Sequence, residues 1–145
     1  MNRRLSILLV DDEVIVRQSM AMLLKRAGHE VIGVGNGESA LAMMARRPFD
    51  LVISDLSMAG MQGDELVERI RRLLPGQPII MVTAFAEEYR IFGRGTGGVD
   101  ALLLKPFTFL ELTDTITQVM AEKTTPFPLD VPPSLAGEPS AADRV

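Results

Sequence analysis

Short apolar runs recur along the chain, at intervals that leave room for a helix between them. They cover residues 6–10, 49–54, 79–82 and 101–104. Runs of this length that are mostly apolar on successive positions are typical of strands buried on both faces of a parallel sheet. Residues 30–34 indicate a further strand. Strand and helix patterns alternate five times, which predicts an α/β fold with a doubly wound parallel sheet and crossover helices.

Between these runs, apolar residues recur at the spacing of amphipathic helices. Gly28 is expected to stop the first helix, Asn36 and Gly37 to open the second, and Pro75 to end the third. Thr108 with Glu111 matches a capping box that starts the last. The residues expected to face inward are Val16, Met20, Leu23, Leu24 and Ala27, then Ala40, Leu41 and Met44, then Leu66, Val67, Ile70, Leu73 and Leu74, and finally Phe109, Leu112, Ile116, Val119 and Met120.

The fourth helix and the C-terminal residues carry the weakest helical signals. A fourth helix is expected within residues 87–95, but Gly93, Gly95, Gly97 and Gly98 lie in or beside it. Because each glycine inside a helix costs about 0.5–1 kcal/mol relative to alanine, this helix should be short or mobile. Prolines interrupt the chain after the last helix, so we expect one domain over residues 1–122 and a Pro-rich flexible tail or linker over residues 123–145.

Composition narrows the classes of protein that fit. A chain of 145 residues supports one domain and little more, and 47% hydrophobic but only 5% aromatic residues predict an aliphatic, Met-rich core. The formal charge of −4 gives no basis for nonspecific DNA binding, which needs a clustered basic face. The Arg pairs at 3–4, 46–47 and 71–72 are scattered and are expected to lie at solvated helix ends.

The chain also lacks signals for secretion or membrane insertion. It contains no Cys, which removes disulfides and thiolate metal sites and is compatible with a reducing compartment. Its first apolar stretch ends in two aspartates rather than in a signal-peptide pattern, and no run approaches transmembrane length. We therefore expect a cytoplasmic location and no membrane partner.

Polar and charged residues stand where the apolar runs end. Asp11 and Asp12 follow the first run, Asp55 follows residues 49–54, and Thr83 and Lys105 follow the two later runs. The carboxyl ends of parallel strands meet at one edge, where open α/β sheets hold ligands. Because the acidic residues offer only oxygen ligands, and the chain has no Cys and a single His, Mg²⁺ fits this site better than zinc.

A carboxylate, an ammonium group, a hydroxyl donor and a divalent cation together suit the developing negative charge of a phosphoryl group. In this order along the chain, these groups resemble the receiver domain of bacterial two-component response regulators. The resemblance covers about residues 5–121 and rests on Asp11-Asp12, on Asp55 at the start of the stretch 55–63, on Thr83-Ala84 and on Lys105-Pro106-Phe107.

The resemblance implies a flavodoxin-like fold, with five strands in the order 2-1-3-4-5 and five helices. It implies that Asp55 accepts a phosphoryl group from a phosphohistidine. It also implies that Mg²⁺ is bound by Asp12 directly, by Asp11 directly or through water, by Asp55 and by the backbone carbonyl of Ser57. A carboxylate beside a divalent ion is neutralised enough to approach an anionic phosphoryl group.

Two further roles follow from the same resemblance. Lys105 would pair with Asp55 before the reaction and with the phosphoryl oxygens afterwards. Thr83 would donate its hydroxyl to a phosphoryl oxygen once the loop after the fourth strand moves inward, which couples the chemistry to a change of shape. A cis Lys105-Pro106 bond belongs to the family pattern, although the sequence alone leaves cis and trans open.

The chain departs from the family pattern at a few positions. Leu102 stands where many receivers have the Tyr or Phe of the aromatic switch. Ala59 replaces the usual Pro, which we expect to loosen that loop without removing the chemistry. Ser57 and Phe85 occupy positions that tune the lifetime of the phosphoryl group in the family, in a direction that the sequence does not indicate.

Other signals are weaker. Residues 93–98 spell GxGxxG, but they precede a strand instead of following one, so a dinucleotide site is not expected. His29, the only histidine, follows Gly28 and is expected to be a solvated loop residue. Tyr89, the only tyrosine, fits a partner surface or an ordinary exposed site equally well.

The leading hypothesis is therefore a phosphorylation-dependent switch, not an enzyme acting on other molecules. Its partners would be a sensor histidine kinase or a histidine phosphotransfer protein and an unknown downstream protein, with no direct contact to nucleic acid. A homodimer through the fourth helix, fifth strand and fifth helix stays open. The alternatives are the receiver portion of a longer regulator, an unphosphorylated receiver-like binding module and an Mg²⁺-dependent aspartyl phosphohydrolase. The last is disfavoured because Asp11 and Asp12 are adjacent and a cap domain cannot fit.

Overall fold

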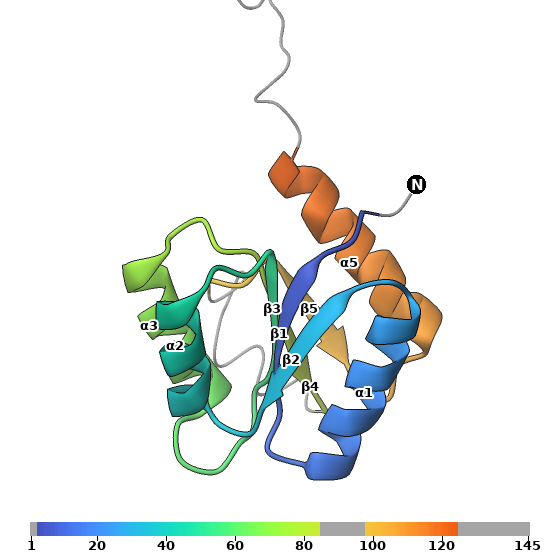
Figure 1. Ribbon diagram of the computed structural model, residues 1–145. Helices are drawn as coiled ribbons and strands as arrows, with labels where there is room; N and C mark the ends of the chain where they lie inside the picture. The colour runs from blue at the N-terminus through green and yellow to red at the C-terminus, as the bar shows by residue number, and fades with distance from the viewer. Residues whose placement is uncertain (1–2, 85–97, 125–145) are drawn as a thin grey trace, which may run out of the picture.

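The sheet has the predicted number and order of strands. The structure is a computed structural model that describes residues 3–84 and 98–124. Its five strands are all parallel and lie in the order β2-β1-β3-β4-β5 (Figure 1). They are β1 Ser6–Val10, β2 Glu30–Val34, β3 Leu51–Asp55, β4 Ile79–Thr83 and β5 Ala101–Leu104. This strand order confirms the flavodoxin-like topology.

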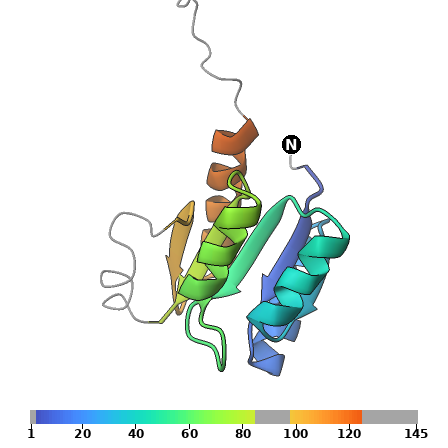
Figure 2. The ribbon, with the colours of Figure 1, turned by 90° about the vertical axis from the view of Figure 1, so that its left-hand side faces the viewer.

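Helices cover both faces of the sheet. Those in the described residues are α1 Val14–Arg26, α2 Gly37–Arg46, α3 Gly63–Leu73 and α5 Phe109–Thr124. α1 and α5 pack on one face, and α2 and α3 pack on the other (Figures 1 and 2). The helix predicted within residues 87–95 falls outside the described part of the chain. Among the residues that the structure describes, no helix has the length and apolar character needed to cross a membrane.

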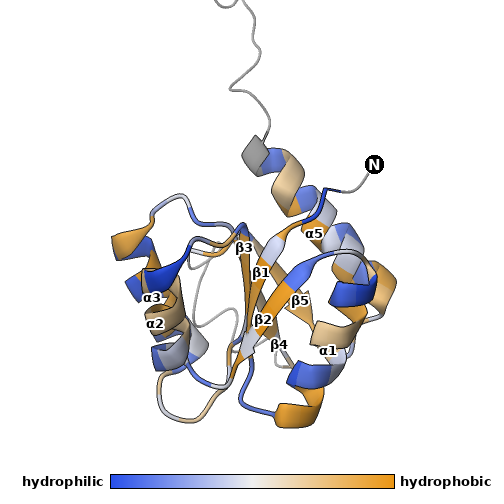
Figure 3. Cartoon of the chain, viewed as in Figure 1, coloured by the Kyte–Doolittle hydropathy of each residue, from blue (hydrophilic) through white to orange (hydrophobic). Residues whose placement is uncertain are grey.

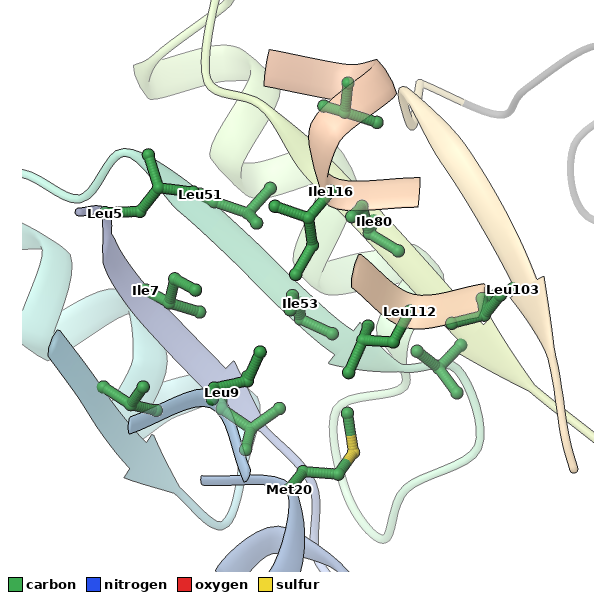
Figure 4. Packing of buried hydrophobic residues seen from close by; sticks show 14 residues of the cluster. Leu5, Ile7, Leu9, Met20, Leu51, Ile53, Ile80, Leu103, Leu112 and Ile116 are labelled. Atoms are coloured by element: carbon green, nitrogen blue, oxygen red, sulfur yellow. The ribbon is translucent and has the colours of Figure 1, made fainter. Parts of the chain in front are cut away.

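The strands are buried because their side chains alternate between two apolar layers. Ile7 and Leu9 point into the layer under α1 and α5, whereas Leu8 and Val10 point into the layer under α2 and α3. Figure 3 shows mainly hydrophobic central strands between helices that carry both kinds of residue. Figure 4 shows the first layer, where Ile53 lies among side chains from several strands and from α5. Each fully buried Leu or Ile contributes about 1.5–3 kcal/mol.

The predicted helix signals are confirmed where the structure tests them. Thr108 and Glu111 form the capping box, with N–H···O distances of 2.9 and 3.0 Å. The side chain of Asn36 caps α2 by accepting from the Ser39 N–H at 2.7 Å. Gly28 follows α1 with φ of 102°, a left-handed conformation that glycine adopts at little cost.

Four of the residues expected to face inward are exposed. Leu23 is 39% exposed, and Leu73 and Leu74 are 71% and 42% exposed. Ala27, the C-cap of α1, is also exposed. Leu74 is itself the C-cap of α3, so the last turn of that helix extends beyond the buried layer. Ala27, Leu73 and Leu74 stand at the ends of their helices, beyond the last buried residue, whereas Leu23 is exposed although Leu24 beside it is fully buried.

Arg71 corrects the expectation of a solvated helix end. Its guanidinium donates to the carbonyl oxygens of Gly98 and Gln77 and to the Asp100 carboxylate, the last at 3.1 Å. Asp100 Oδ2 also accepts from the Ile79 N–H at 2.8 Å. Arg71 therefore joins the end of α3 to the start of β4 and to the residues that lead into β5.

Arg47 is likewise more than a solvated charge. Its guanidinium lies 4.7 Å from the centroid of the Phe49 ring and donates to Glu30 and to the Ser6 hydroxyl. These contacts connect the end of α2 with the first residues of β1 and β2.

Candidate functional site

The polar residues singled out in the sequence meet at the carboxyl edge of the sheet. Asp11 directly follows β1, Asp55 ends β3, Thr83 ends β4, and Lys105 directly follows β5. The strand register sets Asp55 beside Val82 on the neighbouring strand. The Lys105 N–H donates to the Thr83 carbonyl at 2.8 Å, so the ladder between the last two strands continues into the site.

Three carboxylates form an acidic cluster there. One oxygen from each of Asp11, Asp12 and Asp55 lies within 4.8 Å of the others. Asp11 and Asp55 are only 3% and 8% exposed, whereas Asp12 is exposed. A compact set of carboxylate oxygens without nitrogen or sulfur is the ligand chemistry that Mg²⁺ prefers, so these residues fit that ion.

Lys105 places a positive charge against this cluster. Its Nζ lies 3.4 Å from Asp55 Oδ1 and 4.0 Å from Asp11 Oδ2. The Lys105-Pro106 peptide bond is cis, as in the family pattern. The amine is therefore within reach of any group bound at Asp55, and its charge offsets only part of the three carboxylates.

Burial raises the pKa of Asp55 above its ordinary value, because the charged form loses hydration. The nearby carboxylates of Asp11 and Asp12 also raise the pKa, and the Lys105 ammonium opposes these effects without cancelling them. A divalent cation at the cluster would favour the ionised form of Asp55. The site is therefore electrostatically suited to binding a cation.

An open cleft gives access to the cluster. It is lined by Asp12, Glu13, Asp55, Ser57, Ala84 and Lys105. Ser57 therefore lies at the site. That its backbone carbonyl binds Mg²⁺ stays a prediction. Thr83 is 1% exposed at the end of β4.

The turn that carries the acidic pair is held by backbone contacts that the sequence did not reveal. The Glu13 backbone N–H donates to Asp11 Oδ1 at 2.9 Å, and Nη1 of the Arg17 guanidinium donates to the Asp11 carbonyl at 2.7 Å. Glu13 directly follows the acidic pair, so its place near the site could have been predicted. Arg17 lies a full turn into α1, and nothing in the sequence pattern connects it with the site.

Ala59 adds a contact from the loop after β3. Its N–H donates to Asp12 Oδ2 at 2.9 Å. Proline has no N–H and could not make this contact. The expected loosening of the loop by Ala59 stays a prediction.

Comparisons with known proteins agree with this arrangement. The response regulator receiver domain family matches the chain over residues 7–117. The chain belongs to this family. Chemotaxis protein CheY-3 of Vibrio cholerae is 33% identical to this receiver domain over 122 residues, which cover 82% of the chain and 94% of CheY-3. Response regulator protein FleR of Pseudomonas aeruginosa is 36% identical over 112 residues, which cover 77% of the chain but only 24% of FleR.

Solved structures show the same fold. The response regulator TrrA of Thermotoga maritima, in complex with Mg²⁺-BeF, has a TM-score of 0.72 and 32% identity, covering 78% of this receiver domain and 96% of that chain. The chemotaxis response regulator CheY4 of Vibrio cholerae has a TM-score of 0.73 and 32% identity, covering 81% and 99% of the two chains.

The remaining sequence predictions have mixed outcomes. His29 lies in the loop after Gly28, as predicted, but it is half-buried rather than solvated, and its Nδ1 accepts from the Leu5 N–H at 3.1 Å. Burial lowers the pKa of His29. Leu102, at the position of the aromatic switch, is half-buried and packs against the layer under α2 and α3. Tyr89, Phe85 and the tail beyond residue 124 lie outside the described residues, as does most of the GxGxxG stretch.

Proposed function

We propose that this receiver domain accepts a phosphoryl group on Asp55 from a phosphohistidine of a sensor histidine kinase or a histidine phosphotransfer protein. The observation that carries the proposal is the meeting of the Asp55 carboxylate, the Lys105 amine at 3.4 Å and the acidic cluster at one edge of the sheet. Carboxylate, cation and amine are the parts that phosphoryl transfer needs, because catalysis there is mainly positioning and charge stabilisation.

In the proposed reaction, an Asp55 carboxylate oxygen attacks phosphorus in line. The P–N bond to the donor imidazole breaks with its electron pair left on nitrogen, and an acyl phosphate forms. Lys105 approaches the phosphoryl oxygens, and its charge offsets theirs as the P–O bond forms. Asp11, Asp12, Asp55 and the Ser57 carbonyl would hold Mg²⁺, which would supply further neutralisation of charge.

The proposed consequence is a change of shape that alters affinity for a downstream protein. The Thr83 hydroxyl would donate to a phosphoryl oxygen, drawing the loop after β4 toward Asp55. The hydrogen bond from the Lys105 N–H to the Thr83 carbonyl supports this role, because it holds Thr83 beside Lys105 at the edge of the sheet where Asp55 lies.

The domain either acts alone or forms part of a longer regulator. The chain spans nearly all of CheY-3 but about a quarter of FleR, so both a switch that acts alone and a receiver within a longer regulator are compatible with its relatives. We place the protein in the cytoplasm, acting on proteins and not as an enzyme on other molecules. A homodimer through the face that includes β5 and α5 stays a prediction.

Acetyl phosphate with MgCl₂ provides the direct test. Wild-type protein should gain one phosphoryl group that is stable in acid and labile in base, detected by intact mass. Asp55→Asn should lose this modification completely, because the attacking carboxylate is gone. Asp64→Asn is the matched control, since Asp64 is an exposed carboxylate in the first turn of α3. Modification that persists in Asp55→Asn, or that is lost in Asp64→Asn, contradicts the assignment.

A further inference from the structure

We propose that Arg17 is a positioning residue for the cation site, acting through the peptide that joins Asp11 and Asp12. The inference rests on the proposed function, because it concerns the affinity of that site for Mg²⁺. Arg17 lies in α1, is half-buried and touches no carboxylate of the cluster in any contact that the structure describes. Its role would therefore be to orient the ligands, not to bind the ion.

The first observation is how the Asp11 backbone is held. The Asp11 N–H donates to the Val34 carbonyl at the end of β2, at 3.1 Å. On the other side, the Asp11 carbonyl accepts from Arg17 Nη1 at 2.7 Å. This carbonyl belongs to the peptide group between Asp11 and Asp12, so rotation of that peptide would move the two carboxylates relative to each other. A charge-assisted hydrogen bond is stronger than one between neutral groups, which suits it to fixing that rotation.

The second observation is a path for the Arg17 side chain across two glycines. A Cβ atom at Gly33 would lie 3.1 Å from Arg17 Cγ and 3.2 Å from Cδ, and one at Gly35 would lie 3.2 Å from Arg17 Nη1. Neither glycine has a positive φ, so the backbone conformation does not require glycine at either position. A side chain at either position would instead be crowded by the Arg17 side chain, which occupies the adjacent space.

These observations point to one arrangement. Gly33 and Gly35 stand two residues apart, on the same side of the extended chain, and leave a channel along which Arg17 reaches the acidic turn. Contacts to groups outside the ligand set orient metal ligands, and their loss typically weakens metal affinity by 10-fold to 100-fold. Since Arg17 contacts the backbone and not a carboxylate, we expect the lower end of that range.

Mg²⁺ affinity measured by NMR tests the proposal. MgCl₂ is titrated into the uniformly ¹⁵N-labelled full chain, and the amide signals of residues near the acidic pair report saturation. Arg17→Met keeps most of the side-chain length but removes the donor, so its dissociation constant for Mg²⁺ should rise about 10-fold. Arg17→Lys keeps a charged donor and should recover part of the loss. Gly35→Ala crowds the guanidinium and should also weaken binding, whereas Gly76→Ala, which has open space around its Cβ position, should not.

The combination of variants separates positioning from simple stabilisation. If Gly35→Ala acts through Arg17, adding it to Arg17→Met should weaken binding no further, because coupled changes are not additive. Arg17→Met with wild-type Mg²⁺ affinity overturns the proposal, even if its thermal midpoint in EDTA falls. Additive effects of the two changes overturn it as well. Failure of the wild type to bind Mg²⁺, or undiminished binding by Asp12→Asn, would instead show that the proposed cation site itself is wrong.

Discussion

Asp55 combines requirements that oppose each other at a single residue. It is buried at the end of β3, where it meets Lys105, yet burial and two neighbouring carboxylates disfavour its charge and raise its pKa. In the proposed reaction, the charged form of Asp55 is the nucleophile. A cation at the cluster would resolve this opposition, and we expect the same residue to destabilise the fold when the cation is absent.

Asp55→Asn should therefore stabilise the protein in EDTA at pH 7. Because the pKa of Asp55 is raised in the folded state, the folded protein binds this proton more tightly than the unfolded chain. Ionisation of Asp55 then costs stability as the pH rises from the ordinary carboxyl range through the raised pKa, and the cost is fully present above it. Asparagine carries no such charge, so the free energy of unfolding of the variant should exceed that of the wild type at pH 7.

Urea unfolding of both proteins between pH 4 and pH 7.5 measures the difference. The advantage of the variant should shrink as the pH falls, and 10 mM MgCl₂ should stabilise the wild type more than the variant. Two outcomes would contradict this prediction: an Asp55→Asn variant that is less stable than the wild type at pH 7 in EDTA, or a stability difference that grows as the pH falls. Either would show that ionisation of the buried Asp55 does not lower the free energy of unfolding.

At the scale of elements, one arginine connects three segments that the chain separates. Arg71 near the end of α3 donates to Gly98, Gln77 and Asp100, while Arg72 beside it makes only an exposed pair with Glu68 in the contacts described. The two side chains of the Arg71–Asp100 pair are 23% and 16% exposed. Breaking such a pair leaves partly buried acceptors and a carboxylate without their donor.

Arg71→Met should lower the free energy of unfolding by about 2–3 kcal/mol, below the full value for a buried pair because water still reaches these groups. Arg72→Met should change it by no more than about 0.5 kcal/mol, since exposed pairs within a helix contribute little. Chemical denaturation of the two variants provides the measurement. Equal effects of the two changes would mean that the Arg71 contacts contribute no more than a surface ion pair.

The strands and helix ends could be predicted because their signals are local. Apolar runs such as residues 79–82, the Thr108 capping box and the stop at Gly28 each depend on a few adjacent residues. The exposure of Leu73 and the burial of Arg71 depend instead on how far α3 extends over the sheet. A periodic pattern indicates which side of a helix faces inward, but it does not indicate where the sheet beneath the helix ends. The wrong predictions for Leu73 and Arg71 have this common cause.

At the scale of the whole molecule, the side chains of the site could be predicted but not the backbone that holds them. The sequence predicts a site at Asp11, Asp55 and Lys105, because these charged residues stand at the ends of buried strands and parallel strands end at one edge of the sheet. The bonds from Ala59 and Arg17 could not be inferred, since they depend on the path of a loop and on a side chain that lies along the end of β2. No periodic pattern of residues in the sequence predicts either contact.

The first turn of α1, just after the acidic pair, exposes two apolar residues, Val14 and Ile15. Ile15, in the first turn of α1 just after the acidic pair, is 78% exposed, and that turn is coloured as hydrophobic in Figure 3. A protein that delivers a phosphoryl group to Asp55 must cover the surface around the cleft, and exposed apolar side chains supply much of the affinity of such contacts.

Ile15→Asp should therefore slow phosphotransfer from a histidine kinase that phosphorylates the wild type by about 10-fold or more, equivalent to at least about 1.4 kcal/mol. Labelling by acetyl phosphate should stay unchanged, because this small donor needs no docking surface. Leu73→Asp is the matched control, since Leu73 is 71% exposed but lies at the far end of α3. Equal loss with both donors, or in both variants, would remove Ile15 from the docking surface.

The contact between the start of α3 and the end of β3 has a consequence for how the domain transmits a signal. A Cβ atom at Gly63 would lie 2.5 Å from the Asp55 carbonyl oxygen and 2.7 Å from Leu56 Cα, so main chain rests on main chain with no side chain between them. The Gly63 N–H also donates to the Leu56 carbonyl at 2.8 Å. Because backbone atoms are in direct contact there, a displacement of β3 upon the proposed phosphorylation would be transmitted to the start of α3.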